Sequence, residues 1–393
     1  MRFQMSDNRG FTLVEMIVVM AVFIVVLIIT GSTLKTLLDK GIMTQRSEES
    51  NTEGVVGLEI LRHDLQQAGL GLFTDVNSAP TFTEAAGAPY SSYNDANSVP
   101  RPIVTDNNLT VSGVLTGTDY LAIKGTTLAL SSASQLWSYV DDTGVPKRWG
   151  RDDFTDLNDK VIVIEQKLDT SKNMMVRRLV QVAAGNYGVS YYASGAFEDQ
   201  GGNPVTDYTP STTKINYLYG IDTMDTGVAT FTLRAPFNRA DYFINRDVAT
   251  TPASCSPAAG VLFKAVMNQV DGTFDQIPIL DCVADMQIIL GWNTSEEPEK
   301  SNEVQGYSDA AIPATYNDPE EVQKRLRLVM VYLLVQDGRR DSNFINTNSA
   351  MIIGDKVLDP SGNLTKSVDL TSGDFQNYRW KLHRVVVRPK NLF

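Results

Sequence analysis

Few side chains in this sequence have the types and spacing that catalytic chemistry needs. The chain has two histidines, His63 and His383, and two cysteines, Cys255 and Cys282, which lack the close spacing of a zinc site. Phosphate-loop, G-x-S-x-G and H-E-x-x-H motifs are all missing from it. We therefore expect that the protein is not an enzyme.

The most informative ionisable residue is Glu15. Between residues 11 and 38 the only charged side chains are Glu15 and Lys35, and Met16 to Leu34 gives 19 residues without charge. That length is close to the roughly 20 apolar residues that span a bilayer. A carboxylate there is costly and is usually retained for a positively charged partner. The alternative is an incidental acid near the membrane surface.

The segment that carries Glu15 is predicted to be a membrane-spanning helix, because a lone span in lipid must satisfy its own backbone. Arg2 and Arg9 precede it, which by the positive-inside rule leaves the N-terminus cytoplasmic and places the rest outside. Residues 1–10 are too polar for an ordinary secretory signal, and no A-x-A site follows the apolar run. We therefore expect the apolar segment to be kept.

Helical periodicity returns after a polar stretch and predicts a second half of the helix that packs on a domain. One apolar face is formed by Leu58, Leu61, Leu65 and Ala68. Polar residues are expected elsewhere around the helix: Glu59, Arg62 and Asp64. Weak points or kinks are expected at Gly41, Gly54 and Gly57, and a stop at Gly69 and Gly71.

From residue 72 onward the sequence predicts short strands and large loops. The expected strands are Asp119 to Lys124, Val161 to Gln166, Met175 to Val182, Val228 to Leu233, Gly260 to Val266, Met286 to Trp292, Leu326 to Val335 and Tyr378 to Val387. In the last strand the apolar residues change parity, which predicts a bulge near His383 and Arg384. We expect an α+β fold in which a long N-terminal helix packs on an antiparallel sheet with large loop insertions. The β-rich part, residues 72–393, forms one domain or two lobes.

Net charge and residue content indicate which ligands the protein can bind and whether its cysteines are paired. The formal net charge of −12 argues against nucleic acid, since phosphate contacts need clustered Lys and Arg. Loops rich in Asp and Asn at 141–142, 152–159 and 293–302 are compatible with calcium, yet no calcium-loop pattern is complete. We expect solvated loops and no cofactor, with calcium as the alternative. If the domain lies outside the cytoplasm, Cys255 and Cys282 favour a disulfide over two buried thiols.

The N-terminal residues Gly10-Phe11-Thr12-Leu13-Val14-Glu15 resemble the class III signal of type IV pilins and type II secretion pseudopilins. The resemblance implies a leader, residues 1–10, that prepilin peptidase removes by cutting after Gly10. It also implies methylation of the new N-terminal Phe11 and pairing of Glu15 with the Phe11 amine of an adjacent subunit. Residues 11–38 would then be the transmembrane and filament-core half of the helix, and 39–71 the half that meets the domain.

Further motifs are similar to the PilW-like minor pilins, a group related to type II pseudopilin J. They are Leu61-Arg-His-Asp-Leu-Gln-Gln-Ala-Gly69, Gly117-Thr-Asp-Tyr-Leu-Ala-Ile123 and Tyr378-Arg-Trp-Lys-Leu-His-Arg-Val-Val-Val-Arg-Pro-Lys-Asn391. This resemblance implies a minor pilin at the tip or priming complex of a pilus. Its partners would be the major pilin, other minor pilins, the inner-membrane assembly platform and a large tip adhesin.

The same resemblance implies a single-pass protein of the inner membrane with a periplasmic domain, which becomes part of an extracellular pilus. One alternative is a type II secretion pseudopilin. A second is a surface or pilus-tip binding module of the adhesin kind, and a third is an anchored receptor that never polymerises.

Overall fold

The structure is a computed structural model of the 393-residue chain. It describes residues 13–75, 80–95, 98–140, 143–150, 153–169, 174–181, 187–194, 197–198, 215–222, 233–247, 249–347, 349–358, 362–371 and 373–392. Of these, the side chains at 28, 31–53, 169, 174 and 175 are not described. The chain divides into two compact units, residues 1–52 and 53–393. The second holds the sheets and the last turns of the long helix.

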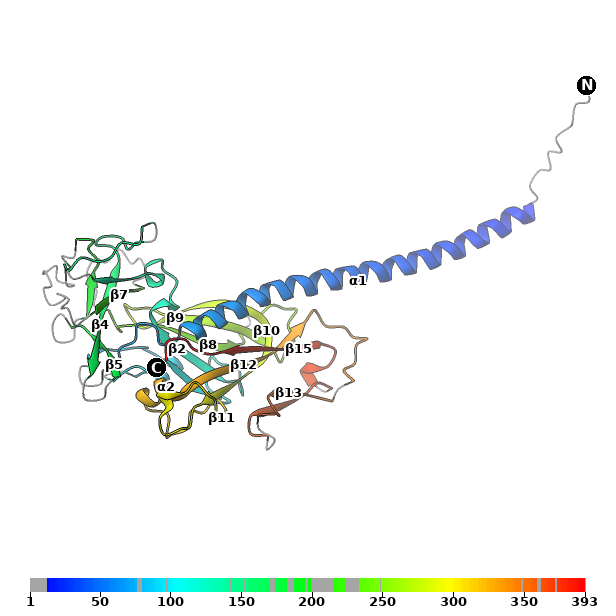
Figure 1. The fold of residues 1–393 in the computed structure, drawn as a ribbon. Helices are drawn as coiled ribbons and strands as arrows, with labels where there is room; N and C mark the ends of the chain where they lie inside the picture. The colour runs from blue at the N-terminus through cyan, green and yellow to red at the C-terminus, as the bar shows by residue number, and fades with distance from the viewer. Residues whose placement is uncertain are drawn as a thin grey trace, which may run out of the picture. The chain divides into compact units, whose positions relative to one another are not determined.

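The described elements comprise one long helix, one short helix, short 3₁₀ turns and strands (Figure 1). The helices are α1 (Leu13–Gln67) and α2 (Pro319–Arg325), and the 3₁₀ turns are η2 (Tyr90–Tyr93), η3 (Thr126–Leu128), η4 (Ala133–Gln135), η5 (Pro298–Lys300) and η6 (Gly373–Phe375). The first strands are β1 (Ile103–Asp106), β2 (Tyr120–Gly125), β3 (Trp137–Val140), β4 (Lys160–Asp169), β5 (Met174–Leu179), β6 (Gly188–Ser190), β7 (Ile215–Ile221) and β8 (Asn238–Asn245). The later strands are β9 (Gly260–Met267), β10 (Phe274–Trp292), β11 (Gly306–Ser308), β12 (Leu326–Asp337), β13 (Ala350–Gly354), β14 (Thr365–Asp369) and β15 (Arg379–Val387).

Among the described residues, three antiparallel sheets make up the β-rich unit. The main sheet has the order β1-β2-β8-β9-β10-β12-β15, with β11 paired to β10. The second sheet has the order β3-β7-β4-β5, with β6 paired to β4, and β13 and β14 form a separate hairpin. With α1 these sheets give an α+β fold with large loops, which confirms the predicted class.

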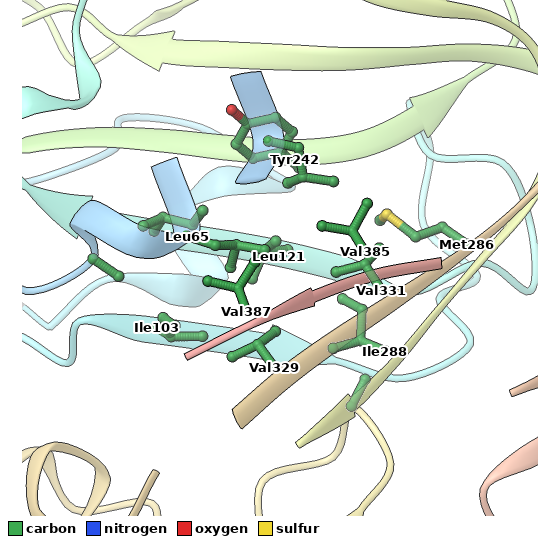
Figure 2. Close-up of a cluster of buried hydrophobic side chains, with 14 of the residues drawn as sticks. Leu65, Ile103, Leu121, Tyr242, Met286, Ile288, Val329, Val331, Val385 and Val387 are labelled. Carbon is green, nitrogen blue, oxygen red and sulfur yellow. The ribbon is translucent and has the colours of Figure 1, made fainter. Parts of the chain in front are cut away.

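The core of the main sheet is closed by the last turns of α1. Leu61, Leu65 and Ala68 are fully buried and belong to one cluster with side chains from the sheet strands. Figure 2 shows Leu65 beside Leu121 of β2 and Val387 of β15. Burying one leucine side chain contributes about 1.5–3 kcal/mol, so these turns hold the helix end firmly on the sheet. The predicted apolar face is confirmed at these positions.

The main sheet is covered on both faces, which explains the parity change in β15. Val385 and Val387 lie in the cluster with α1, whereas Trp380 and Leu382 lie in a second cluster with Ile353 of β13. The register between β12 and β15 runs without a shift from Val329↔Val387 to Asp337↔Arg379. The predicted bulge near His383 and Arg384 was therefore wrong. A regular strand shows apolar residues of both parities when different partners cover its two faces.

Several sequence predictions are confirmed by the strand bounds. The strands expected at Asp119 to Lys124, Val161 to Gln166, Gly260 to Val266 and Leu326 to Val335 correspond to β2, β4, β9 and β12. The strand expected at Met286 to Trp292 is the second half of the 19-residue β10, whose first half pairs with β9 and second half with β12. The strand expected at Val228 to Leu233 lies, except for its last residue, outside the described residues. The predicted domain boundaries stay predictions.

The glycines near the end of α1 allow close packing and do not interrupt the helix. α1 is continuous from Leu13 to Gln67. A Cβ atom at Gly57 would lie 2.0 Å from the carbonyl oxygen of Ile279 in β10. At Gly54 it would lie 3.3 Å from the Cδ1 atom of Leu280, a side chain that can move. Gly57 is therefore needed where helix and strand backbones touch. Gly69 and Gly71, by contrast, adopt positive φ angles of 83° and 68° just after the helix ends, as a stop signal requires.

This difference predicts opposite effects for two matched substitutions. Alanine is favoured over glycine in a helix by about 1 kcal/mol. Gly57→Ala should nevertheless lower the free energy of unfolding by about 1–3 kcal/mol, because the backbone of β10 blocks the added methyl group. Gly54→Ala should be neutral or slightly stabilising. Urea denaturation of the detergent-solubilised full chain measures both, and equal effects would contradict the assignment.

Candidate functional site

The N-terminal motif is described only in part. Gly10 and Phe11 lie outside the described residues, and α1 begins two positions later, at Leu13. Glu15 lies in the first turn of α1 and is exposed. A carboxylate in the first turn interacts favourably with the helix dipole, so the helix start itself accommodates Glu15.

The helix that follows Glu15 exposes apolar side chains all around its circumference. Those from Leu13 to Ile29 that the structure describes expose between 51% and 75% of their surface. A continuous apolar surface of this extent is rarely left in water and marks a contact with lipid or with another protein.

Among the described residues, none of the helices is both long enough and apolar enough to cross a membrane. The span expected from the sequence, Met16 to Leu34, includes side chains at 28 and 31–34 that are not described.

At its other end, α1 is fixed to the main sheet by a buried carboxylate. The Oδ2 atom of Asp64 lies 2.6 Å from the Nζ atom of Lys264 in β9 and accepts a 2.6 Å hydrogen bond from the hydroxyl of Tyr242 in β8. The side chains of Asp64 and Lys264 are 3% and 7% exposed. One charge pair and one hydrogen bond thus join the helix to two neighbouring strands.

The surroundings of Asp64 change the titration of its neighbours. Burial, and then the nearby Asp64 carboxylate, raise the pKa of Tyr242 well above its usual value. The pKa of His63 is also raised, chiefly by the hydrogen bond with Asp64, where the Nδ1 and Oδ1 atoms are 3.4 Å apart. Tyr242 therefore stays a hydrogen-bond donor to Asp64 at neutral pH.

Sequence reasoning placed Asp64 on the polar side of the helix, and this was wrong. Asp64 is three positions after Leu61 and four before Ala68, so it lies at the edge of the apolar face that these residues define. Its angular position was the available signal. A carboxylate on a buried face needs a cation opposite, and Lys264 supplies it.

The C-terminal residues also contact the end of α1. The backbone amide of Lys390 donates to the carbonyl oxygen of Gln66 at 3.1 Å, and Leu392 is fully buried in the main core. A Cβ atom at Gly69 would lie 2.9 Å from the Cδ2 atom of Leu392, so the two segments are in close contact. The helix end is therefore held by β-strands on one side and by residues 390–392 on another.

A second group of buried charges holds the loop around residues 84–101 on β2 and β8. The nitrogen-to-oxygen distances are 2.8 Å for Lys124–Glu84, 2.6 Å for Lys124–Asp95, 3.1 Å for Arg239–Glu84, 2.7 Å for Arg239–Asp241 and 2.7 Å for Arg101–Asp95. Burial acts to raise the pKa of Asp95, but Lys124 and Arg101 lower it below its usual value. The three cations are thus neutralised by three carboxylates, which indicates that this network stabilises the fold.

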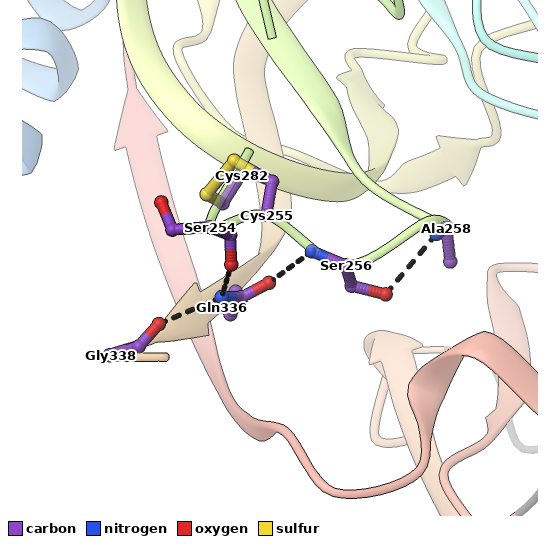
Figure 3. The surroundings of a disulfide bond; sticks show 7 residues. All are labelled: Ser254, Cys255, Ser256, Ala258, Cys282, Gln336 and Gly338. Atoms are coloured by element: carbon purple, nitrogen blue, oxygen red, sulfur yellow. Dashed lines mark hydrogen bonds between the residues drawn. A yellow bond between two sulfur atoms is a disulfide. The ribbon is translucent and has the colours of Figure 1, made fainter. Parts of the chain in front are cut away.

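Cys255 and Cys282 form a disulfide, with a sulfur–sulfur distance of 1.97 Å and Cα atoms 5.0 Å apart (Figure 3). Cys255 lies in the loop before β9, and Cys282 lies in β10 where the register with β9 shifts, with a φ of 55°. Gln336 of β12 holds the same loop through a 2.6 Å bond from the Ser256 amide and a 2.9 Å bond to the Ser254 carbonyl oxygen. The loop is thus fixed to two adjacent strands.

The acidic loops bond mainly to their own backbone. Asp153 accepts from the amides of Trp149 and Gly150, and Asp159 accepts from the amide of Thr155. Residues 141, 142 and 152 lie outside the described residues. In the part of the chain that is described, no group of three or more His, Cys, Asp or Glu side chains could hold a metal ion.

The buried Asp64–Lys264 pair predicts a large loss of stability on neutralisation. Asp64→Asn leaves Lys264 buried without its counter-charge, which should lower the free energy of unfolding by about 3–5 kcal/mol. Glu59→Gln, which removes a carboxylate that is 70% exposed on the same helix, should change it by less than about 0.5 kcal/mol. Thermal or urea unfolding compares them, and a similar loss in both variants would refute the special role of Asp64.

The disulfide closes a separation of 27 residues and should stabilise the domain. Replacing both cysteines by serine is expected to cost about 3–4 kcal/mol, because the unfolded chain regains conformational entropy. Adding a thiol reductant should lower the unfolding midpoint of the native protein and leave that of the double variant unchanged. A native midpoint that does not respond to complete reduction would show that the bond contributes little.

Comparison with protein-family models matches residues 5–31 to the prokaryotic N-terminal methylation motif. The matched range includes Gly10, Phe11 and Glu15 and runs into the apolar part of α1. No curated protein matches the chain, and no solved structure does. The motif at the head of α1 therefore indicates a type IV pilin-like protein that is processed as a prepilin and interacts with prepilin peptidase and pilus-assembly partners.

Proposed function

We propose that this chain is a PilW-like minor pilin that helps to initiate assembly at the tip of a type IV pilus. The observation that carries the proposal is the N-terminal methylation motif at residues 5–31, which overlaps the start of the 55-residue helix α1. Prepilin peptidase would cut after Gly10, and the new N-terminal Phe11 would be methylated. The proposal assigns the protein no catalytic role and no cofactor.

The first half of α1 has the properties of an element that exchanges one apolar environment for another. Its described apolar side chains are more than half exposed, and Glu15 interrupts them near the start. In the bilayer this surface would contact lipid, and in a filament it would contact the helices of other subunits. Burial is then retained during assembly, so the transfer is not opposed by the hydrophobic effect.

Glu15 would set the register of that assembly. Cleavage after Gly10 creates a free amine on Phe11, and an amine is positively charged at neutral pH. In a low-dielectric filament core, a carboxylate and an amine attract strongly when they are adjacent and are costly when separate. Pairing Glu15 with the Phe11 amine of a neighbouring subunit would therefore favour one axial position over others.

The domain that follows would face outward from the membrane and then from the pilus. A disulfide between Cys255 and Cys282 suits an oxidising compartment outside the cytoplasm. Other minor pilins, the major pilin, the inner-membrane assembly platform and a large tip adhesin are the proposed partners of this unit.

The proposal is tested on pili sheared from cells and analysed by mass spectrometry. The filament fraction should contain a peptide that begins with methylated Phe11. Glu15→Ala should still be cleaved and methylated in the membrane, yet its recovery from filaments should fall about tenfold or more, since about 1.4 kcal/mol already gives that factor. Glu59→Ala, an exposed carboxylate in the same helix, is the matched control and should be incorporated normally.

Three outcomes would count against the proposal. Normal incorporation of Glu15→Ala would remove the assembly role of that carboxylate. Recovery of the processed chain only from membranes of normally piliated cells would favour an anchored receptor. Loss of protein export, with pili intact, in cells that lack the chain would instead identify a type II secretion pseudopilin.

A further inference from the structure

A cavity of about 830 Å³ lies within the β-rich unit, between the end of α1, helix α2 and the second sheet. Its walls include Gln67 of α1, Gln323 of α2 and Tyr219 of β7, which are distant in sequence. Sites for small organic ligands range over about 300–1,000 Å³, so the volume suits a ligand of one to a few sugar or amino-acid units. This cavity is separate from the N-terminal motif and from the buried charge network.

The described charges that line this cavity are mainly positive, in contrast to the chain as a whole. Three described lining residues are cations: Arg177, Lys324 and Lys390. One is a carboxylate, Glu320, whose Oε1 atom lies 2.6 Å from the Nζ atom of Lys324. The protein carries a formal charge of −12, so a local excess of cations is a specific feature of this site. Cations gathered in a concave surface raise the local concentration of anionic ligands.

Arg177 is the most informative of these cations. Its Nη1 atom donates to the carbonyl oxygen of Gly69 at 3.3 Å, and no described carboxylate lies within ion-pair distance of it. Burial lowers the pKa of its guanidinium, and the nearby Tyr219 acts in the opposite direction with a smaller effect. Elsewhere in the domain the buried Arg239 faces two carboxylates. With respect to the described residues, Arg177 therefore keeps donors that could bind a carboxylate through two parallel hydrogen bonds.

Two further polar atoms on the cavity wall lack hydrogen-bond partners among the described residues. They are the Nε2 atom of Gln323, whose residue is 7% exposed, and the Oγ1 atom of Thr127. A buried donor without a partner is costly, and such atoms are usually paired by a ligand or by water. Both atoms belong to residues that line the cavity, and a ligand rich in oxygen acceptors is the kind that would satisfy such donors.

A row of aromatic rings extends from the cavity wall to the surface of the second sheet. Ring centroids are 6.4 Å apart for Tyr219–Tyr217, 6.4 Å for Tyr217–Trp137 and 5.3 Å for Trp137–Trp149. Trp137 and Trp149 are 45% and 51% exposed, and the indole of Trp149 donates to the carbonyl oxygen of Trp137 at 2.9 Å. Exposed and fixed aromatic faces offer a flat apolar surface that is already organised for stacking.

We propose that this cavity binds an acidic saccharide, with the sugar carboxylate at Arg177 and the ring faces against Trp137 and Tyr217. The C–H face of a pyranose packs on an aromatic ring, and its hydroxyl and carboxylate oxygens accept from Arg177, Gln323 and Thr127. Nucleic acid fits less well, because the chain has a net charge of −12 and only three of the described residues that line the cavity are cations. An extended peptide would instead favour an open sheet edge.

The site is tested with the full-length chain in detergent micelles, independently of whether it joins a pilus. Immobilised oligosaccharides ending in glucuronic acid or N-acetylneuraminic acid are the probes. Neutral saccharides of the same length, a glutamate-rich peptide and single-stranded DNA are the comparisons. We expect saturable binding to an acidic saccharide that is at least about tenfold tighter than to its neutral counterpart, as loss of a charge-assisted hydrogen bond implies.

Variants then locate the binding. Arg177→Gln removes the guanidinium, and Trp137→Ala removes an exposed aromatic ring. Each should weaken acidic-saccharide binding about tenfold or more. Arg178→Gln makes the same charge change at the next residue of β5, which is exposed and does not line the cavity, and should bind as the native chain does. Unfolding midpoints of all three confirm that they fold. If Arg177→Gln fails to fold, Trp137→Ala and Lys390→Gln still decide the outcome.

Several results would overturn the proposal. These are no binding to any acidic saccharide, equal binding of acidic and neutral saccharides, or binding confined to the acidic peptide or to DNA. An equal loss in Arg177→Gln and Arg178→Gln would also overturn it, because a general charge effect would then replace a defined site. A failure here leaves the assembly role intact, since incorporation into pili is measured separately.

Discussion

The main sheet can be stable in water only because both of its faces are covered by other parts of the chain. The last turns of α1 bury Leu61, Leu65 and Ala68 on one face, and the hairpin β13–β14 covers part of the other. Each layer removes apolar surface that a single sheet would expose. The position of the helix end is therefore the constraint on which the β-rich unit depends, and Gly57, Asp64 and residues 390–392 all serve it.

Much of the fold could be predicted from the sequence, because the strongest signals are local. The α+β class, α1, the glycine stop after it and strands such as β9 and β12 follow from periodicity and turn residues. Strand β8 was missed because Arg239 and Asp241 make it look polar, whereas both are buried in an ion network with Glu84. Pairing between residues 155 positions apart leaves no local trace. The parity change in β15 was misread because one-sided burial was assumed.

The candidate sites also differ in whether local sequence is enough to predict them. The N-terminal motif is contiguous, so the six residues from Gly10 to Glu15 could be singled out from the sequence, and they lie within the range that the family comparison matches. Asp64 needed its partner strands to be known, although its angular position among leucines was visible. The cationic cavity combines α1, α2, the second sheet and the C-terminal segment, and its lining residues are ordinary in their own sequence contexts. Such a site exists only after the tertiary fold has brought distant segments together.

The contact between the end of α1 and residues 390–392 has a further consequence for the order of folding. The side-chain amide of Asn391 donates to the carbonyl oxygen of Gln66 at 3.4 Å across a separation of 325 residues. We expect contacts between residues so far apart in sequence to form late in folding. Closing such a long loop costs conformational entropy, which is offset only when other contacts have already formed. The N-terminal motif is synthesised long before residues 390–392, which complete the packing around the end of the helix. Recognition by the processing enzyme and maturation of the domain are thus separated in time by the chain's own topology.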